Sequence, residues 1–239
     1  MKTRRITQLG LAFVVAIAWI GIGQAVGHEI TIVAPTGLED MEGSNRIDTG
    51  DGPFRVQFLY AASDFRSLPE GHRLIVGTAG RADDRQSNPF SRSYADLEIR
   101  LSTTSVNDLS TTYADNIGQD ETLVFDGPSS VSYPATGPAE GPRPFSEGGT
   151  FQTPFFYEPS LGNLLVDITA PLGSTGDSGS FDAHETVGSR SLVSGDPTQA
   201  VGQWDTIVQV RQFTFVPEPT TFALVCLGLI GLLAAKKRD

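Results

Sequence analysis

The chain has 239 residues and a formal net charge of −11 at pH 7. Six of its 17 basic and two of its 28 acidic residues lie near the termini, so residues 28–216 carry 11 basic and 26 acidic residues, a net charge of −15. Such an acidic surface repels nucleic acid and anionic lipid, so no nucleic-acid partner is expected. All three lysines are terminal and the single cysteine is Cys226, which excludes a lysine Schiff base, a P-loop, a disulfide and a thiolate nucleophile from residues 28–216.

Residues 1–27 have the three parts of a secretory signal peptide. A basic cluster is followed by an apolar stretch from Leu9 to Ile22 and then by small residues. This order predicts export through the Sec machinery, with cleavage after Ala25 or Gly27. An uncleaved N-terminal anchor is the alternative, because apolar length alone does not separate the two.

Residues 28–215 are predicted to form one exported all-β domain. β-Branched and aromatic residues gather in short stretches bounded by Gly, Pro or Asp, and no long segment there keeps a helical period. This pattern predicts an antiparallel β-sandwich of jelly-roll type. The predicted strands are Glu29–Val33, Phe54–Tyr60, His72–Gly77, Asp96–Ser102, Thr122–Phe125, Leu164–Ile168 and Thr206–Val216.

Two predicted strands carry more detail. In Asp96–Ser102 the apolar residues alternate with polar ones, which places one face in the core and the other in water. In Thr206–Val216, Val208 and Val210 occupy even-numbered positions, whereas Phe213 and Phe215 occupy odd-numbered ones. In a regular strand the two pairs would point to opposite faces of the sheet. This change predicts a bulge near Arg211–Gln212 or burial on both faces. The segments 134–149 and 173–180, rich in Gly, Pro or Ser, are expected to be exposed loops.

Residues 216–239 contain a Pro-Glu-Pro stretch, an apolar run and a basic end. Pro217, Glu218 and Pro219 precede Thr220–Ala235, which spans about 24 Å as a helix, short of the roughly 30 Å hydrocarbon core. We therefore expect a marginal transmembrane helix. Lys236, Lys237 and Arg238 would stop transfer and stay cytoplasmic. An ordinary single-span anchor is the alternative to a sorting signal.

From Pro217 to Asp239 these parts resemble, in order and spacing, the tail of the bacterial PEP-CTERM proteins. The resemblance implies recognition by an exosortase, a membrane cysteine protease-transferase, which removes the tail. It also implies sorting to the envelope or exopolysaccharide matrix of a Gram-negative bacterium. The segment Asp96–Asp167, with Tyr113-Ala-Asp-Asn and Gly162-Asn-Leu-Leu-Val-Asp-Ile, resembles a module of other PEP-CTERM proteins that has no assigned activity.

No motif in the chain indicates catalysis, so we predict that the protein is not an enzyme. Gly176-Asp177-Ser178-Gly179 resembles the nucleophile loop of chymotrypsin-like proteases, but Ser180 and Phe181 follow where Gly-Pro is usual. A flexible loop explains the same residues. His28, His72 and His184 are isolated and lack the spacing of a zinc site, so no metal or other cofactor is predicted.

Acidic residues in the loops could bind a structural calcium ion. The stronger hypothesis is that these loops are simply solvated. The candidate sets are Glu39-Asp40-Glu42, Asp48 with Asp51, and Asp115-Asn116 with Asp120-Glu121. Aromatic residues on a sheet surface would stack on sugars, although at strand positions they are more often core. The candidates are Tyr60, Tyr94, Tyr113, Tyr133, Phe155, Phe156, Tyr157 and Trp204.

We therefore expect an exported, non-enzymatic protein of the envelope or matrix with a structural or adhesive role. Its expected partners are the exosortase, the Sec machinery and the membrane during sorting, and exopolysaccharide afterwards. One alternative is a carbohydrate-binding module for exopolysaccharide. The other is a secreted glycoside hydrolase, whose paired carboxylates come from different strands and leave no local motif.

Overall fold

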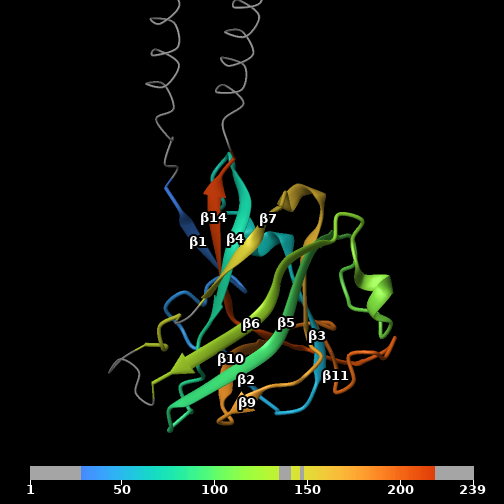
Figure 1. Ribbon diagram of the computed structural model, residues 1–239. Helices are drawn as coiled ribbons and strands as arrows, with labels where there is room; N and C mark the ends of the chain where they lie inside the picture. The colour runs from blue at the N-terminus through green and yellow to red at the C-terminus, as the bar shows by residue number, and fades with distance from the viewer. Residues whose placement is uncertain (1–27, 135–140, 146–147, 219–239) are drawn as a thin grey trace, which may run out of the picture.

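The computed structural model describes residues 28–134, 141–145 and 148–218 (Figure 1). Every strand pair in this part of the chain is antiparallel, and its helical elements are three short 3₁₀ turns. These turns are η1 (Ala62–Phe65), η2 (Tyr113–Asn116) and η3 (Pro159–Leu161). The all-β prediction is confirmed.

The strands form two larger sheets and a small one. The four-stranded sheet has the order β1 (Ile30–Ala34), β14 (Arg211–Pro217), β4 (His72–Gly80), β7 (Gly148–Phe156). The seven-stranded sheet runs β12 (Gln203–Asp205), β11 (Ser191–Ser194), β3 (Phe54–Tyr60), β8 (Asn163–Ala170), β5 (Phe90–Thr104), β6 (Thr122–Tyr133), with β9 (Thr175–Gly176) also on β5. The third sheet has the order β13 (Ile207–Gln209), β10 (Ser180–Glu185), β2 (Asn45–Asp48).

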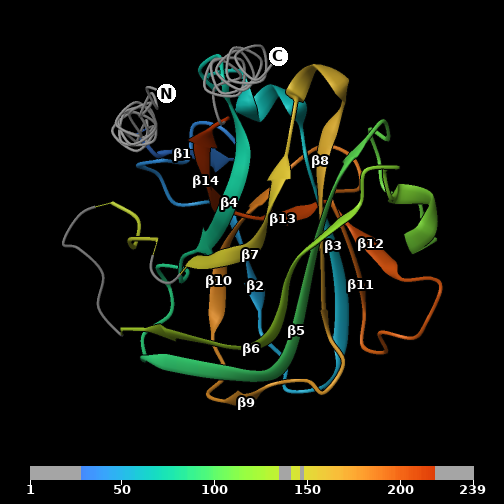
Figure 2. The same ribbon diagram turned by 45° about the horizontal axis from the view of Figure 1, so that its top comes forward.

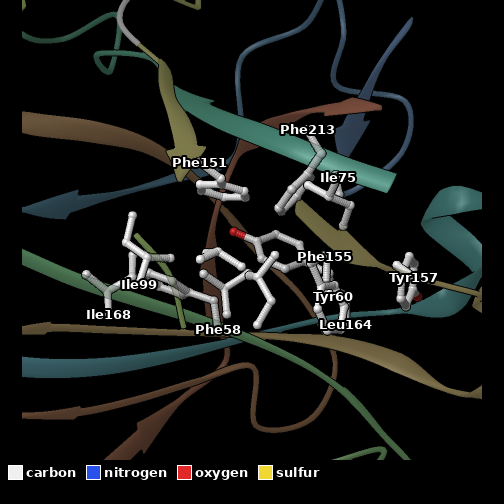
Figure 3. Packing of buried hydrophobic residues seen from close by; sticks show 14 of the residues in the cluster. Phe58, Tyr60, Ile75, Ile99, Phe151, Phe155, Tyr157, Leu164, Ile168 and Phe213 are labelled. Atoms are coloured by element: carbon white, nitrogen blue, oxygen red, sulfur yellow. The ribbon is translucent and has the colours of Figure 1, made fainter. Parts of the chain in front are cut away.

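The main core lies between the two larger sheets, which form a sandwich. Figure 2 shows β4 and β7 on one side of the molecule and β3, β5 and β11 on the other. Phe213 and Phe155 of the four-stranded sheet belong to the same buried cluster as Phe58 and Leu164 of the seven-stranded sheet (Figure 3). Burying apolar surface between two sheets in this way is the dominant stabilising contribution to the fold.

A second, smaller core covers the outer face of the seven-stranded sheet. Leu109 and Tyr113, from the segment between β5 and β6, pack on Leu59, Leu165 and Leu192 of the sheet. Along β5, Leu97, Ile99 and Leu101 are buried in the main core as the alternation predicts. The prediction that the other face meets water is wrong at Ser102, which is buried and whose Oγ accepts a hydrogen bond from the Gly118 N–H at 3.1 Å.

The segment predicted as one strand over Thr206–Val216 is two strands in different sheets. β13 pairs with β10, while β14 lies between β1 and β4. The buried residue Val210 joins them. No bulge occurs at Arg211–Gln212, because β14 keeps one register with β1 there; the irregularities of β14 lie after Thr214 and after Val216. The change of parity therefore reflects a strand that passes from one sheet to another.

Both ends of the described chain leave the same end of the four-stranded sheet. Ile30, at the start of β1, pairs with Phe215, near the end of β14 (Figure 1). The predicted cleavage residues Ala25 and Gly27, together with Pro219 and the basic residues Lys236, Lys237 and Arg238, lie outside the described residues. Within the described residues, no helix has the length and apolar character needed to span a membrane.

Candidate functional site

A cavity of about 510 Å³ lies inside the domain. Its walls are mostly apolar and come from all three sheets. Val56, Leu97 and Ile99 belong to the seven-stranded sheet, Phe151 to the four-stranded sheet, and Ile47 to the small one. Cavities of this size, lined by apolar side chains with a few polar groups, are the usual form of a small-molecule site.

Arg211 places a positive charge in the wall of this cavity. It begins β14, directly after the residue where the chain leaves the small sheet. One Nη atom donates to Gln209 Oε1 at 2.7 Å, and the guanidinium carbon lies 5.7 Å from the centroid of the Phe58 ring. The Nε atom is buried and has no hydrogen-bond partner in the described part of the chain. An unpartnered buried donor is costly, so this atom is the most unusual feature of the cavity.

Of the described residues that line the cavity, only Asp48 and Arg211 are charged. Asp48 is engaged elsewhere: it accepts a hydrogen bond from Ser180 Oγ at 2.6 Å and lies 3.2 Å from Arg46 Nε. Glycoside hydrolysis needs two carboxyl groups facing the substrate. This cavity offers one, and the outward contacts of Asp48 direct it to the rim.

A network of charged groups joins the segment after β1 to β10. Arg81 and Asp182 form a fully buried ion pair, and Arg85 chelates Asp83 with contacts of 2.8 and 2.7 Å. Glu42 Oε1 accepts from the Asp84 N–H at 2.9 Å. Burial, and then the neighbouring carboxylate of Asp182, raise the pKa of Glu42 to about 7.

Within the described residues, the group of three carboxyl oxygens that lies within 4.8 Å belongs to Glu42, Asp83 and Asp84. Only Glu42 comes from a set predicted for calcium. Asp48 and Asp51 separate instead, because Asp51 contacts Arg92 at 2.8 Å. Asp120 accepts from the Thr103 N–H at 2.7 Å and so stabilises a turn. Sequence distance hid Asp83 and Asp84, which lie about 40 positions from Glu42.

The Gly-Asp-Ser-Gly loop is held in place by a buried arginine. Arg92 of β5 donates to the Asp177 carbonyl at 2.8 Å and to the Gly50 carbonyl at 2.6 Å, and it pairs with Asp51. At Gly179 a Cβ atom would lie 2.4 Å from the ring of Phe90. The loop therefore has a packing role that explains its glycine. His184, the nearest histidine in sequence, contacts Ser44 through Nδ1 at 3.3 Å.

The motif residues of the segment Asp96–Asp167 form a buried polar network on the outer face of the larger sheet. Asn116 donates to Gln57 Oε1 at 2.9 Å, and Gln57 donates to Asp167 Oδ2 at 2.7 Å. Arg55 completes it with two contacts to Asp167 at 3.0 and 2.6 Å and lies 4.4 Å from the centroid of the Tyr113 ring. These residues fasten the segment between β5 and β6 to the sheet.

Most of the aromatic candidates for sugar stacking are core residues. Tyr60, Tyr113, Tyr133, Phe155 and Tyr157 are buried, and Tyr94 lines the cavity. The two exposed members are Phe156, at 49 %, and Trp204, at 56 %. They belong to different sheets, so the eight residues do not form one stacking surface.

The Pro-Glu-Pro stretch begins where β14 ends. Pro217 is the last residue of the strand and pairs in register with His72. The Glu218 N–H donates to the Gly71 carbonyl at 2.8 Å, while the Glu218 side chain is exposed. The domain thus presents the first part of this stretch at its surface, in extended conformation.

Comparison with known proteins concerns this same end of the chain. Residues 215–238 match the PEP-CTERM protein-sorting motif. None of the curated proteins compared with the chain matches it. The motif implies that the protein is exported and that an exosortase is its processing partner. The sorting motif begins inside β14 and continues beyond it, so the chain carries the sorting tail of a PEP-CTERM protein.

Proposed function

We propose that this protein is a structural or adhesive component of the bacterial envelope or exopolysaccharide matrix, without enzymatic activity. The sorting motif at residues 215–238, continuous with β14, is the observation that carries the proposal. The N-terminal signal is removed after Ala25 or Gly27 during Sec export. The tail then holds the domain at the membrane until the exosortase acts.

The sequence of the tail supports temporary anchoring. Residues 220–235 insert in the bilayer, and Lys236, Lys237 and Arg238 hold the cytoplasmic side. Pro217 has no N–H to donate, so the strand has a natural end there. The exposed Glu218 gives the processing enzyme a charged group next to that end.

Mass spectrometry of the protein from its native host tests the sorting step. The mature protein is expected to lack the peptide from Lys236 to Asp239 and to begin after Ala25 or Gly27. The variant E218Q is expected to keep its tail and remain in the membrane fraction. E185Q, which alters an exposed glutamate on β10, is the matched control and is expected to be processed. An intact carboxyl terminus in the matrix fraction would refute processing.

The exposed Trp204 on β12 favours carbohydrate binding as a second candidate function. An exposed indole on a sheet is a common surface for stacking against sugars. A pull-down of the full chain with the host's exopolysaccharide tests this function. W204A is expected to reduce retention, whereas F156A, an exposed aromatic on the other sheet, is expected to leave it unchanged. Equal retention of all three proteins would leave the purely structural role.

A further inference from the structure

The cavity contains a positive charge that the described part of the protein does not neutralise. Arg211 has no carboxylate within ion-pair distance among the described residues. Its hydrogen bond to Gln209 is to a neutral amide oxygen, and the neighbouring Tyr60 hydroxyl is also neutral. Its Nε has no hydrogen-bond partner among the described residues. Asp48, the other charged residue of the wall, is 64 % exposed and bound to Ser180 and Arg46. Arg211 is half-buried, so water solvates part of its charge, but an anion at the buried Nε would remove the cost of leaving that donor unpartnered.

Three other arginines with buried or partly buried side chains show a different arrangement. Arg81 pairs with Asp182, Arg55 with Asp167, and Arg92 with Asp51. Each of these cations has a carboxylate within 2.8 Å. Arg143, which lines a second cavity, donates to the carbonyls of Pro134 and Gln86. Arg211 differs from these arginines because it lines the apolar cavity and its Nε has no hydrogen-bond partner among the described residues.

The remainder of the cavity suits a hydrocarbon chain. Phe125, Val131 and Phe151 line it, together with the apolar residues of β3 and β5. A volume of about 510 Å³ with such walls favours an apolar occupant over ordered water. The charge and the apolar walls together describe a molecule with one charged end.

We propose that the cavity binds a single amphiphile, a long-chain fatty acid whose carboxylate meets Arg211 and whose hydrocarbon chain lies along Val56, Leu97 and Phe151. A carboxylate accepts charge-assisted hydrogen bonds from the free edge of a guanidinium, including Nε–H. The chain replaces water against the inner faces of both larger sheets. This binding function goes beyond the proposed structural role and does not depend on exosortase processing.

Photo-crosslinking of the full chain in the membranes of expressing cells tests the proposal. The probe is a palmitic acid analogue with a diazirine in the chain and an alkyne at its end. The corresponding alcohol is the uncharged comparison, and a lysophospholipid analogue tests whether a phosphate replaces the carboxylate. Mass spectrometry then identifies the labelled peptides. The acid is expected to label peptides of β3, β5 and β7 about tenfold more than the alcohol does, the size of effect expected for a hydrogen bond to a charged group.

Variants separate binding at Arg211 from general attraction to lipid. R211Q is expected to remove the preference for the acid, and R211K to keep most of it. V56W, which fills the cavity, is expected to lower labelling by both probes. R66Q changes an exposed arginine outside the cavity and is expected to match the wild type. Equal labelling by acid and alcohol, labelling confined to peptides outside the cavity, or stronger labelling by the lysophospholipid would overturn the fatty-acid assignment.

Discussion

Arg81 and Asp182 form an ion pair in which both side chains are fully buried, with 2.6 Å between Nη2 and Oδ2. The remaining bonds of the pair go to backbone groups. Arg81 also donates to the Met41 carbonyl, and the Gly43 N–H donates to Asp182 Oδ1 at 2.9 Å. The pair therefore joins the segment after β1 to β10 and closes one end of the sandwich.

Removing one partner of this pair is expected to destabilise the domain strongly. D182N leaves the Arg81 cation buried without an anion, which costs about 3–5 kcal/mol. R46Q removes an ion pair whose side chains are 46 % and 64 % exposed and is expected to cost less than about 1 kcal/mol. Urea unfolding followed by tryptophan fluorescence measures both. Similar midpoints for the two variants would contradict this account.

Glu42 is expected to make the stability fall as the pH rises. Burial raises the pKa of Glu42 from 4.5 to about 7 in the folded state, so the folded protein holds a proton that the unfolded chain releases earlier. Stability is then greatest below about pH 4.5 for this group and is lost as the pH rises towards 7. Because Glu42 is partly exposed, the change is about 1–2 kcal/mol.

The variant E42Q is expected to flatten this part of the pH profile in urea unfolding between pH 4.5 and 7.5. E70Q changes an exposed carboxylate and is expected to keep the wild-type slope. If E42Q and the wild type show the same slope, the titration of Glu42 does not contribute.

The Gly-Asp-Ser-Gly loop is expected to respond to its second glycine and not to its serine. In G179A the new methyl group meets the Phe90 ring, which is itself packed on Tyr133 and Phe181. Overpacking of this kind costs about 1–3 kcal/mol. S178A changes an exposed side chain and is expected to be within about 0.5 kcal/mol of wild type. Thermal unfolding measures both variants, and G179A is expected to melt at a lower temperature than S178A. Equal melting temperatures would show that the loop tolerates both changes.

Asn116 is expected to be the residue of η2 that the fold needs most. In N116A the Gln57 amide oxygen and the Ser110 N–H lose their partners, and buried unsatisfied groups cost about 1–3 kcal/mol each. N107A, at an exposed position in the same segment, is the matched control. Hydrogen exchange is expected to be faster over residues 105–121 in N116A alone. Unchanged exchange in both variants would show that the apolar contacts of Tyr113 are enough to hold residues 105–121 on the sheet without Asn116.

The sequence predicts strands where side chains alternate between core and surface. Leu97, Ile99 and Leu101 are an example, because a period of two is visible without any partner strand. The sequence does not predict β2 and β12, because these strands are short and mostly polar and their pairing depends on β10 and β11. It also fails at Val210, since nothing local distinguishes a bulge from a strand that changes sheets.

The sites follow the same division. The sorting motif is contiguous, so residue order alone predicts it. The cavity is formed by residues from three sheets, and Arg211 resembles any surface arginine until the strands are paired. The only sequence feature that could have indicated Arg211 is the change from even-numbered to odd-numbered apolar positions between Val210 and Phe213. This change marks the point where the chain crosses between sheets.

The position of β14 determines how the domain carries mechanical load. Because β14 lies between β1 and β4, a force applied through Pro217 acts along a strand that is bonded on both sides. When the opposing force acts at the far end of the sandwich, these hydrogen bonds are loaded together in shear and do not open one after another as in unzipping. A domain attached to a cell at this strand would then need a larger force to unfold than one attached through an edge strand.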